Sequence, residues 1–208
     1  MLSSKKIFFL TVCCLSFLMF SCGGKKDDTS ETNIIDFENP EVVLQQAQKV
    51  LGANVKLAYK GKFDSDSVIE IAAGLEVQDA KDWGIKFALL KMSDNKLNPV
   101  FETSLLNGSF KECHVQKINL PSLNYELIYY NSQDYFLGSG GGEVYSYIIN
   151  YNENKTYYAH LIAEPGRPTS LYLSDNIDVP EVKSFFLTNF KRDYPGFKMV
   201  SKDIVLKY

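Results

Sequence analysis

The chain lacks the surplus of basic residues that nucleic-acid-binding proteins carry. It has 22 lysines and arginines against 25 aspartates and glutamates, a formal net charge of −3. Binding to nucleic acid needs a basic patch or stripe, so the composition disfavours that function. The sequence also lacks a repeat strong enough to indicate a solenoid or a propeller. The negative charge instead favours a soluble protein beside an anionic surface.

Long hydrophobic runs are scarce as well. The longest, Ile7 to Phe20, has fourteen residues and follows Lys5 and Lys6. A helix needs about 20 apolar residues to cross the hydrocarbon core of a membrane, so this run is short for a permanent anchor. Basic residues, then an apolar core, then a small residue are typical of a secretory signal. We therefore expect export.

The end of this run has a distinctive motif, Met19-Phe20-Ser21-Cys22. It resembles the lipobox of bacterial lipoproteins: Ser21 fits the small-residue position, and Met19 stands where leucine is usual. The resemblance implies that residues 1–21 form a signal peptide that is removed just before Cys22. It also implies that Cys22 is diacylated and anchors the mature protein to a membrane.

A polar segment, 22–35, follows the motif and is predicted to be a flexible tether. Within it, Lys26-Asp27-Asp28 is similar to the surface-export signal of some Gram-negative lipoproteins. That similarity implies a place on the outer face of the outer membrane. The alternative is a hydrophilic tether without an address, which would leave the protein on the periplasmic leaflet.

Cysteine is scarce in the rest of the chain. If Cys13 and Cys14 leave with the signal and Cys22 carries lipid, only Cys113 remains. No intrachain disulfide can then form. Residues 36–208, which we expect to form a single domain, must be held by their core. A domain of about 150 residues buries roughly 70% of its unfolded surface, so this length is sufficient.

Helix signals stand near both ends of this domain. Asn39 is a candidate N-cap and Gly52 follows the last turn, which predicts a helix over 40–51. Asp178 and Glu181 are three residues apart and predict a capping box for a second, C-terminal helix.

Between the helices, apolar residues alternate with period two, and Asn, Asp, Gly or Pro mark the breaks. The predicted strands are 54–60, 68–77, 84–92, 99–105, 113–119, 125–131, 144–151, 156–163 and 169–174, with a further short one at 199–206. Spacing near ten residues favours consecutive antiparallel strands. The prediction is an α+β fold: a mostly antiparallel sheet of seven to nine strands with one helix near each end of the domain.

The glycine-rich segment 138–143 is the most conspicuous loop. A phosphate-binding glycine loop joins a strand to a helix, whereas this one leads into the predicted strand 144–151. We expect a hairpin connection or a bulge. A loop that closes over a ligand through Gly140 and Gly141 is the alternative.

Two carboxylates precede the strand 68–77. The segment around Asp64 and Asp66 resembles the calcium loop of integrin-type β-propellers, in which hard oxygens converge on the ion. The resemblance implies Asp64 and Asp66 as ligands and Glu70 as a weaker third. The alternative is an ordinary acidic turn, and we expect no metal.

The strands 144–151 and 156–163 carry an aromatic face. If 152–155 is a four-residue loop, Tyr147 pairs with His160. One face then carries Tyr145, Tyr147, Ile149, Tyr151, Tyr158, His160 and Ile162. This face either packs against a helix as core or forms an exposed platform for a sugar ring or a partner protein.

No catalytic or cofactor motif stands out, and we expect no cofactor. The leading hypothesis is a non-catalytic binding module at the outer membrane, with a glycan or an envelope protein as partner and no nucleic acid. Its candidate ligand face comprises Tyr145, Tyr147, Tyr158, His160, Gly140 and Gly141. The alternatives are a hydrolase of unrecognised type that uses His160, and a periplasmic envelope or immunity-type lipoprotein with one protein partner.

Overall fold

The computed structural model of the protein describes residues 36–66, 68–79, 81–135 and 140–199. All described residues belong to one compact unit, Ile35–Tyr208. The lipobox-like motif with Cys22 and the segment Lys26-Asp27-Asp28 lie outside the described residues. In the described part, no helix is both long and apolar enough to span a membrane.

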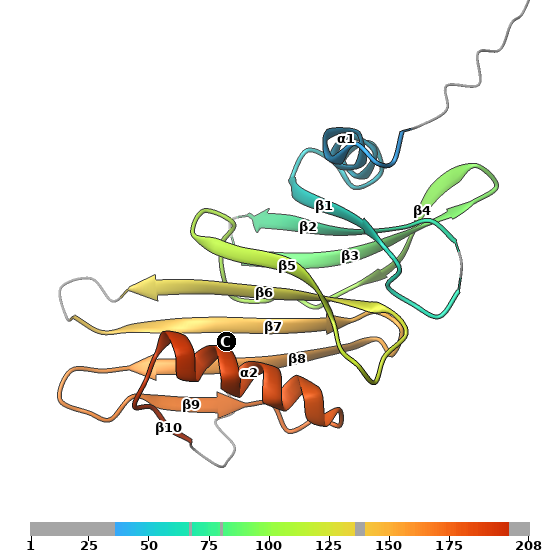
Figure 1. The fold of residues 1–208 in the computed structure, drawn as a ribbon. Helices are drawn as coiled ribbons and strands as arrows, with labels where there is room; N and C mark the ends of the chain where they lie inside the picture. The colour runs from blue at the N-terminus through green and yellow to red at the C-terminus, as the bar shows by residue number, and fades with distance from the viewer. Residues whose placement is uncertain (1–35, 67, 80, 136–139, 200–208) are drawn as a thin grey trace, which may run out of the picture. The chain divides into compact units, whose positions relative to one another are not determined.

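The described strands form two sheets rather than the single predicted one (Figure 1). The first sheet has the order β1-β2-β3-β4, with β1 (Val55–Gly61), β2 (Glu70–Gln78), β3 (Trp83–Ser93) and β4 (Lys96–Glu102). The second has the order β10-β9-β8-β7-β6-β5, with β5 (Cys113–Asn119), β6 (Glu126–Tyr135), β7 (Gly142–Asn150), β8 (Lys155–Ala163), β9 (Ser170–Leu173) and β10 (Lys198–Met199).

Neighbouring strands pair antiparallel throughout, apart from the parallel pair β9–β10. The α+β class and the antiparallel pairing are thus confirmed, whereas the single sheet of seven to nine strands is wrong. Of the last predicted strand, 199–206, all but Met199 lies outside the described residues.

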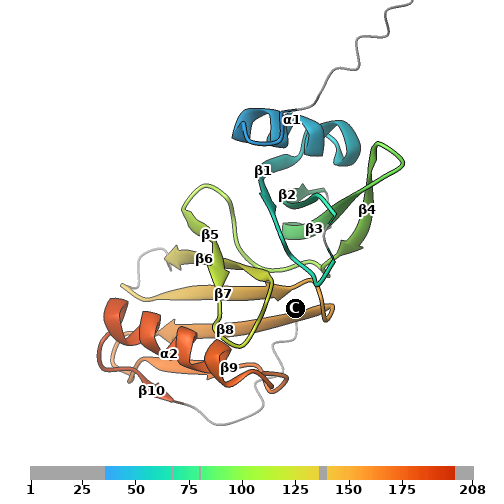
Figure 2. The same cartoon turned by 45° about the vertical axis from the view of Figure 1, so that its right-hand side comes forward.

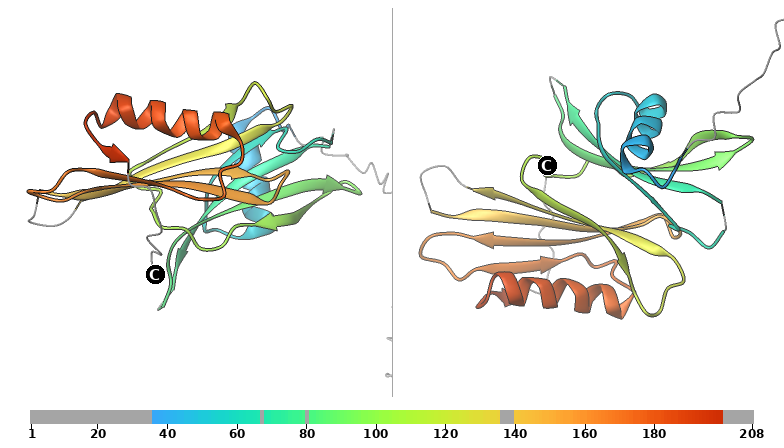
Figure 3. Two further views of the ribbon diagram at one scale, coloured as in Figure 1. Left: turned by 90° about the horizontal axis from the view of Figure 1, so that it is seen from below. Right: turned by 45° about the horizontal axis from the view of Figure 1, so that its top comes forward.

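Each helix covers the outer face of one sheet (Figure 2). Helix α1 (Pro40–Leu51) buries Val43 and Ala47 against Ile71 and Leu90 of the first sheet. Helix α2 (Pro180–Asp193) lies along the second sheet (Figure 3) and buries three side chains in the cluster formed there. These three are Val182, Phe186 and Phe190.

The inner faces of the two sheets share a third, aromatic cluster. Phe87 of β3 meets Tyr130 of β6 edge-on, with ring centroids 5.8 Å apart. Phe63, just after β1, meets Tyr151, which follows β7, at 5.6 Å. Because each sheet has a helix on one face and the other sheet on its second face, central strands such as β7 are buried on both sides.

The two helix starts differ in how they are capped. At α1 the prediction is confirmed: the Asn39 side chain accepts a hydrogen bond of 2.9 Å from the backbone N–H of Glu41. At α2 the predicted capping box is wrong, because the N-cap is Val179 and no side chain caps the helix. The Asp178 carboxylate instead accepts a 2.9 Å hydrogen bond from Tyr157 and pairs with Lys155.

Candidate functional site: a tyrosine–histidine face on the second sheet

The β7–β8 hairpin places Tyr145 opposite His160 and Tyr147 opposite Tyr158. The predicted pairing of Tyr147 with His160 is therefore wrong by two residues, because the turn begins one residue earlier, at Tyr151. An even shift leaves every side chain on the same face of the sheet. The face defined by the prediction is therefore kept, although its cross-strand pairs change.

This face divides into a buried and a half-buried part. Tyr147, Ile149 and Tyr151 are buried in the cluster between the sheets. For these three residues the core alternative is confirmed, but the first sheet covers them and not a helix, since α2 lies on the opposite face. Tyr145 and Tyr158 are half-buried and pack at the margin of the same cluster.

His160 and Glu143 hold Tyr145 in place. The imidazole of His160 stacks on the Tyr145 ring, with centroids 4.7 Å apart and planes 16° apart. His160 Nε2 lies 2.9 Å from Glu143 Oε2, and the Tyr145 hydroxyl donates to the same carboxylate oxygen. Tyr172, opposite His160 on β9, extends the face with its ring centroid 6.4 Å from the imidazole. The arrangement fixes one aromatic ring by stacking and by hydrogen bonding together.

The imidazole is buried, with 3% of His160 exposed. Burial lowers the pKa of His160, although the hydrogen bond with Glu143 acts in the opposite direction. The ring is therefore neutral at neutral pH, with Nε2 donating to Glu143 and Nδ1 left as an acceptor. Nδ1 is buried and has no hydrogen-bond partner. Within the described part of the chain, no serine or cysteine is hydrogen-bonded to this ring as a nucleophile would be.

The glycine-rich segment connects β6 to β7 as a hairpin, since Tyr135 pairs with Gly142 at its base. The interpretation as a hairpin connection is confirmed. Gly140 has φ +69°, a conformation that glycine adopts readily, and Gly141 is buried. Residues 136–139 lie outside the described part, so whether the loop contacts a ligand stays a prediction.

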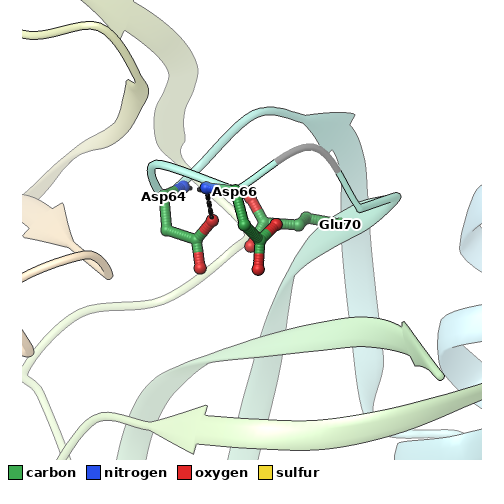
Figure 4. A group of neighbouring side chains, drawn as sticks. All are labelled: Asp64, Asp66 and Glu70. Carbon is green, nitrogen blue, oxygen red and sulfur yellow. Dashed lines mark hydrogen bonds between the residues drawn. The ribbon is translucent and has the colours of Figure 1, made fainter.

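The three candidate calcium ligands do converge in space (Figure 4). Ligand oxygens of Asp64, Asp66 and Glu70 all lie within 4.8 Å of one another. Lys91 on β3 enters the same group: its Nζ lies 2.8 Å from Asp66 and 3.3 Å from Glu70, and it also pairs with Asp64. A lysine ammonium thus occupies the position that a cation would take, and a metal ion would have to displace it.

Glu70 is the buried member of this acidic group. Its Oε2 accepts hydrogen bonds from the backbone N–H groups of Phe63, at 2.5 Å, and Asp64, at 3.0 Å. Burial raises the pKa of Glu70 to about 7, against the opposing effect of the Phe63 hydrogen bond. Glu70 of β2 therefore connects the loop after β1 with Lys91 of β3.

A separate pocket of about 370 Å³ lies where the start of α1 meets β1 and β5. No residue of this pocket was predicted as functional. Its lining comprises Phe37, Glu38, Pro40, Val43, Ala58, Tyr59, Lys60, Gly61 and Lys117.

Several residues of these sites were not predicted from the sequence. Glu143 and Tyr172 could have been found from the alternation of β7 and β9, which continues the aromatic face. Lys91 could not, because it meets Glu70 only through the β2–β3 pairing. No known protein family, curated protein or solved structure matches the chain. Its function is therefore argued from these sites.

Proposed function

We propose that this protein is an outer-membrane lipoprotein, held by a lipid on Cys22, whose folded part is a non-catalytic binding module. The apolar run before Cys22 and the polar tether after it support the anchor. Lys26-Asp27-Asp28 supports display on the cell surface. The membrane is thus the first partner, and a glycan or an envelope protein is the second.

The anchor is tested by fractionation of cells that express the full chain. Cys22→Ser should leave the membrane fraction, and a variant that still sediments with membranes would contradict lipidation. Protease treatment of intact cells tests the address. Cleavage of the domain supports surface display, whereas a protected domain would indicate the periplasmic alternative.

The observation that carries the binding function is the fixed ring of Tyr145. Stacking on His160 and the hydrogen bond to Glu143 leave this half-buried ring little rotational freedom. A rigid aromatic side chain loses little conformational entropy on binding, and tyrosine combines a flat apolar face with a polar tip. The half-buried rings of Tyr158 and Tyr172 extend the platform. His160 acts here as a positioning residue.

Glycan arrays and crosslinking of intact cells, both with the full chain, test this function. Tyr145→Ala and Tyr172→Ala should each weaken capture of the ligand at least about tenfold. Trp83→Ala is a matched control, since it removes a ring that is 56% exposed on the other sheet. Equal effects of all three variants, or no ligand in either assay, would contradict the proposal.

The hydrogen bond between His160 and Glu143 favours a hydrolase as the second candidate. In many hydrolases an imidazole acts as the general base and a carboxylate orients it. A panel of ester, amide and glycoside substrates distinguishes the two. Turnover that is abolished in His160→Gln would favour the hydrolase. Turnover that is unchanged in this variant, or no turnover at all, leaves the binding module as the better reading.

A further inference from the structure

The pocket beside α1 has the size and lining of a small-molecule site. Its volume of about 370 Å³ falls within the range of roughly 300–1,000 Å³ for such sites. Its apolar lining includes Phe37, which precedes α1, and Pro40 and Val43 from the first turn of α1. Tyr59 also belongs to the lining, and its hydroxyl donates a 3.1 Å hydrogen bond to the carbonyl of Val115.

Two lysines also belong to the lining of the pocket. Lys60 and Lys117 both line it. Lys117 Nζ donates to the backbone carbonyl of Lys60 at 3.0 Å and lies 3.0 Å from Glu126. The Lys60 ammonium pairs with Glu38. Each lysine of the lining thus has one carboxylate partner, Glu38 for Lys60 and Glu126 for Lys117.

Glu38 marks the position of a carboxylate in this pocket. Its side chain is 83% exposed, although its carboxylate contacts Lys60. Ion pairs of such exposed groups contribute little, so another carboxylate can replace this one at small cost.

The edge of the first sheet adds a backbone donor. β1 is an edge strand, and the carbonyl of Lys60 points to its free side, where it accepts from Lys117. In a strand, the N–H and C=O of one residue point to the same side. The N–H of Lys60 therefore also points to the free side of β1, where it can donate to one oxygen of a ligand carboxylate.

We infer that this pocket binds a small monocarboxylate with an apolar body. The ligand carboxylate takes the place of Glu38 at Lys60, and the apolar body lies against Phe37, Pro40 and Val43. This site is distinct from the tyrosine–histidine face, and the inference does not depend on the binding function proposed for that face.

Calorimetric titration of the full chain in nanodiscs, with empty nanodiscs as blank, tests the inference. The probes are 3-phenylpropionate and its neutral counterpart, 3-phenylpropanamide. The acid should bind saturably below about 1 mM, and the amide about three- to fivefold more weakly. Lys60→Met should weaken binding of the acid about three- to fivefold. Lys86→Met is the matched control, since Lys86 has similar exposure and pairs with Glu102 at 2.6 Å, and it should bind like the wild type.

Glu38→Gln provides a test of opposite sign. Removal of the competing carboxylate should strengthen binding of the acid about two- to fourfold, an effect that a damaged fold would not produce. Ala58 belongs to the lining of the pocket. Ala58→Leu, which adds volume there, should abolish binding with little change in the thermal unfolding of the protein. The inference is overturned if neither probe binds, if acid and amide bind equally, or if Glu38→Gln leaves the affinity unchanged.

Discussion

At the scale of single residues, Glu70 makes the stability of the fold depend on pH. Burial raises its pKa from 4.5 to about 7, so the folded protein holds this proton more tightly than the unfolded chain. The resulting stabilisation is complete below about pH 4.5 and is lost as pH rises through about 7. Glu70→Gln should therefore reduce the decline in unfolding free energy between pH 5 and 8 by on the order of 1–3 kcal/mol.

Urea unfolding at a series of pH values measures this decline. Glu102→Gln, on β4, controls for the loss of one exposed carboxylate. A Glu70→Gln variant with the wild-type slope would show that another group carries the proton.

Gly108 is a residue at which only glycine fits. Its φ is +130°, and a Cβ added there would lie 2.2 Å from the hydroxyl oxygen of Tyr130. That hydroxyl is itself fixed by a 2.9 Å hydrogen bond to the carbonyl of Ser109. Gly108→Ala should destabilise the protein by about 3–5 kcal/mol through backbone strain and overpacking together.

The matched control for this substitution is Gly166→Ala. Gly166 has φ +77°, but a Cβ there meets nothing within 4 Å. It should cost only the backbone strain, about 1–2 kcal/mol in chemical denaturation. Similar losses in both variants would mean that the contact with Tyr130 relaxes freely.

At the scale of elements, local signals predict the ends of helices and strands well where local contacts decide them. The Asn39 cap and the helix after it agree with the sequence, because the cap bond spans two residues. The box of Asp178 and Glu181 fails because Lys155, twenty-three residues away, competes for the same carboxylate. A capping motif in the sequence does not form its cap when a residue far away in the chain binds the capping side chain.

The division into two sheets escapes prediction for a related reason. Alternation of apolar and polar residues reports burial on one face. Strands such as β2 and β7 are buried on both faces by a helix and the other sheet. Their pattern therefore holds no information on which strands are neighbours, and β4 and β5 look like consecutive members of one sheet.

Substitutions in the C-terminal helix should show how strongly one buried helix contributes to the free energy of unfolding. Phe186 of α2 is fully buried against the second sheet, whereas Phe185 is half-buried and meets Tyr129 edge-on at 5.0 Å. Phe186→Ala should cost about 3–5 kcal/mol through the cavity that it leaves. Phe185→Ala should cost less than half of that, because its ring is only partly buried and leaves a smaller cavity. Equal losses by urea denaturation would contradict this orientation of α2.

At the scale of the whole molecule, the candidate sites differ in how many of their residues the sequence can predict. The membership of the tyrosine–histidine face follows from alternation within one hairpin, which is a local property. The pocket beside α1 joins β1 with Lys117 of the second sheet, and Lys91 reaches its acids across a strand pair. Sites assembled from distant segments need the pairing of strands, which no local pattern contains.

The shared aromatic cluster predicts that the two sheets unfold together. Phe87 meets Tyr130, and Phe63 meets Tyr151, so neither sheet keeps its inner core without the other. The chain has one tryptophan, Trp83, on β3 of the first sheet. Its fluorescence should therefore report the same unfolding midpoint as circular dichroism of the whole protein.

Phe186→Ala makes this test decisive, because its cavity lies on the far side of the second sheet from Trp83. If the sheets form one cooperative unit, this substitution should lower the midpoint reported by Trp83 fluorescence as much as the midpoint from circular dichroism. A midpoint for Trp83 that stays at the wild-type value while circular dichroism shifts would mean that the first sheet, with its pocket and its acidic group, folds independently of the tyrosine–histidine face.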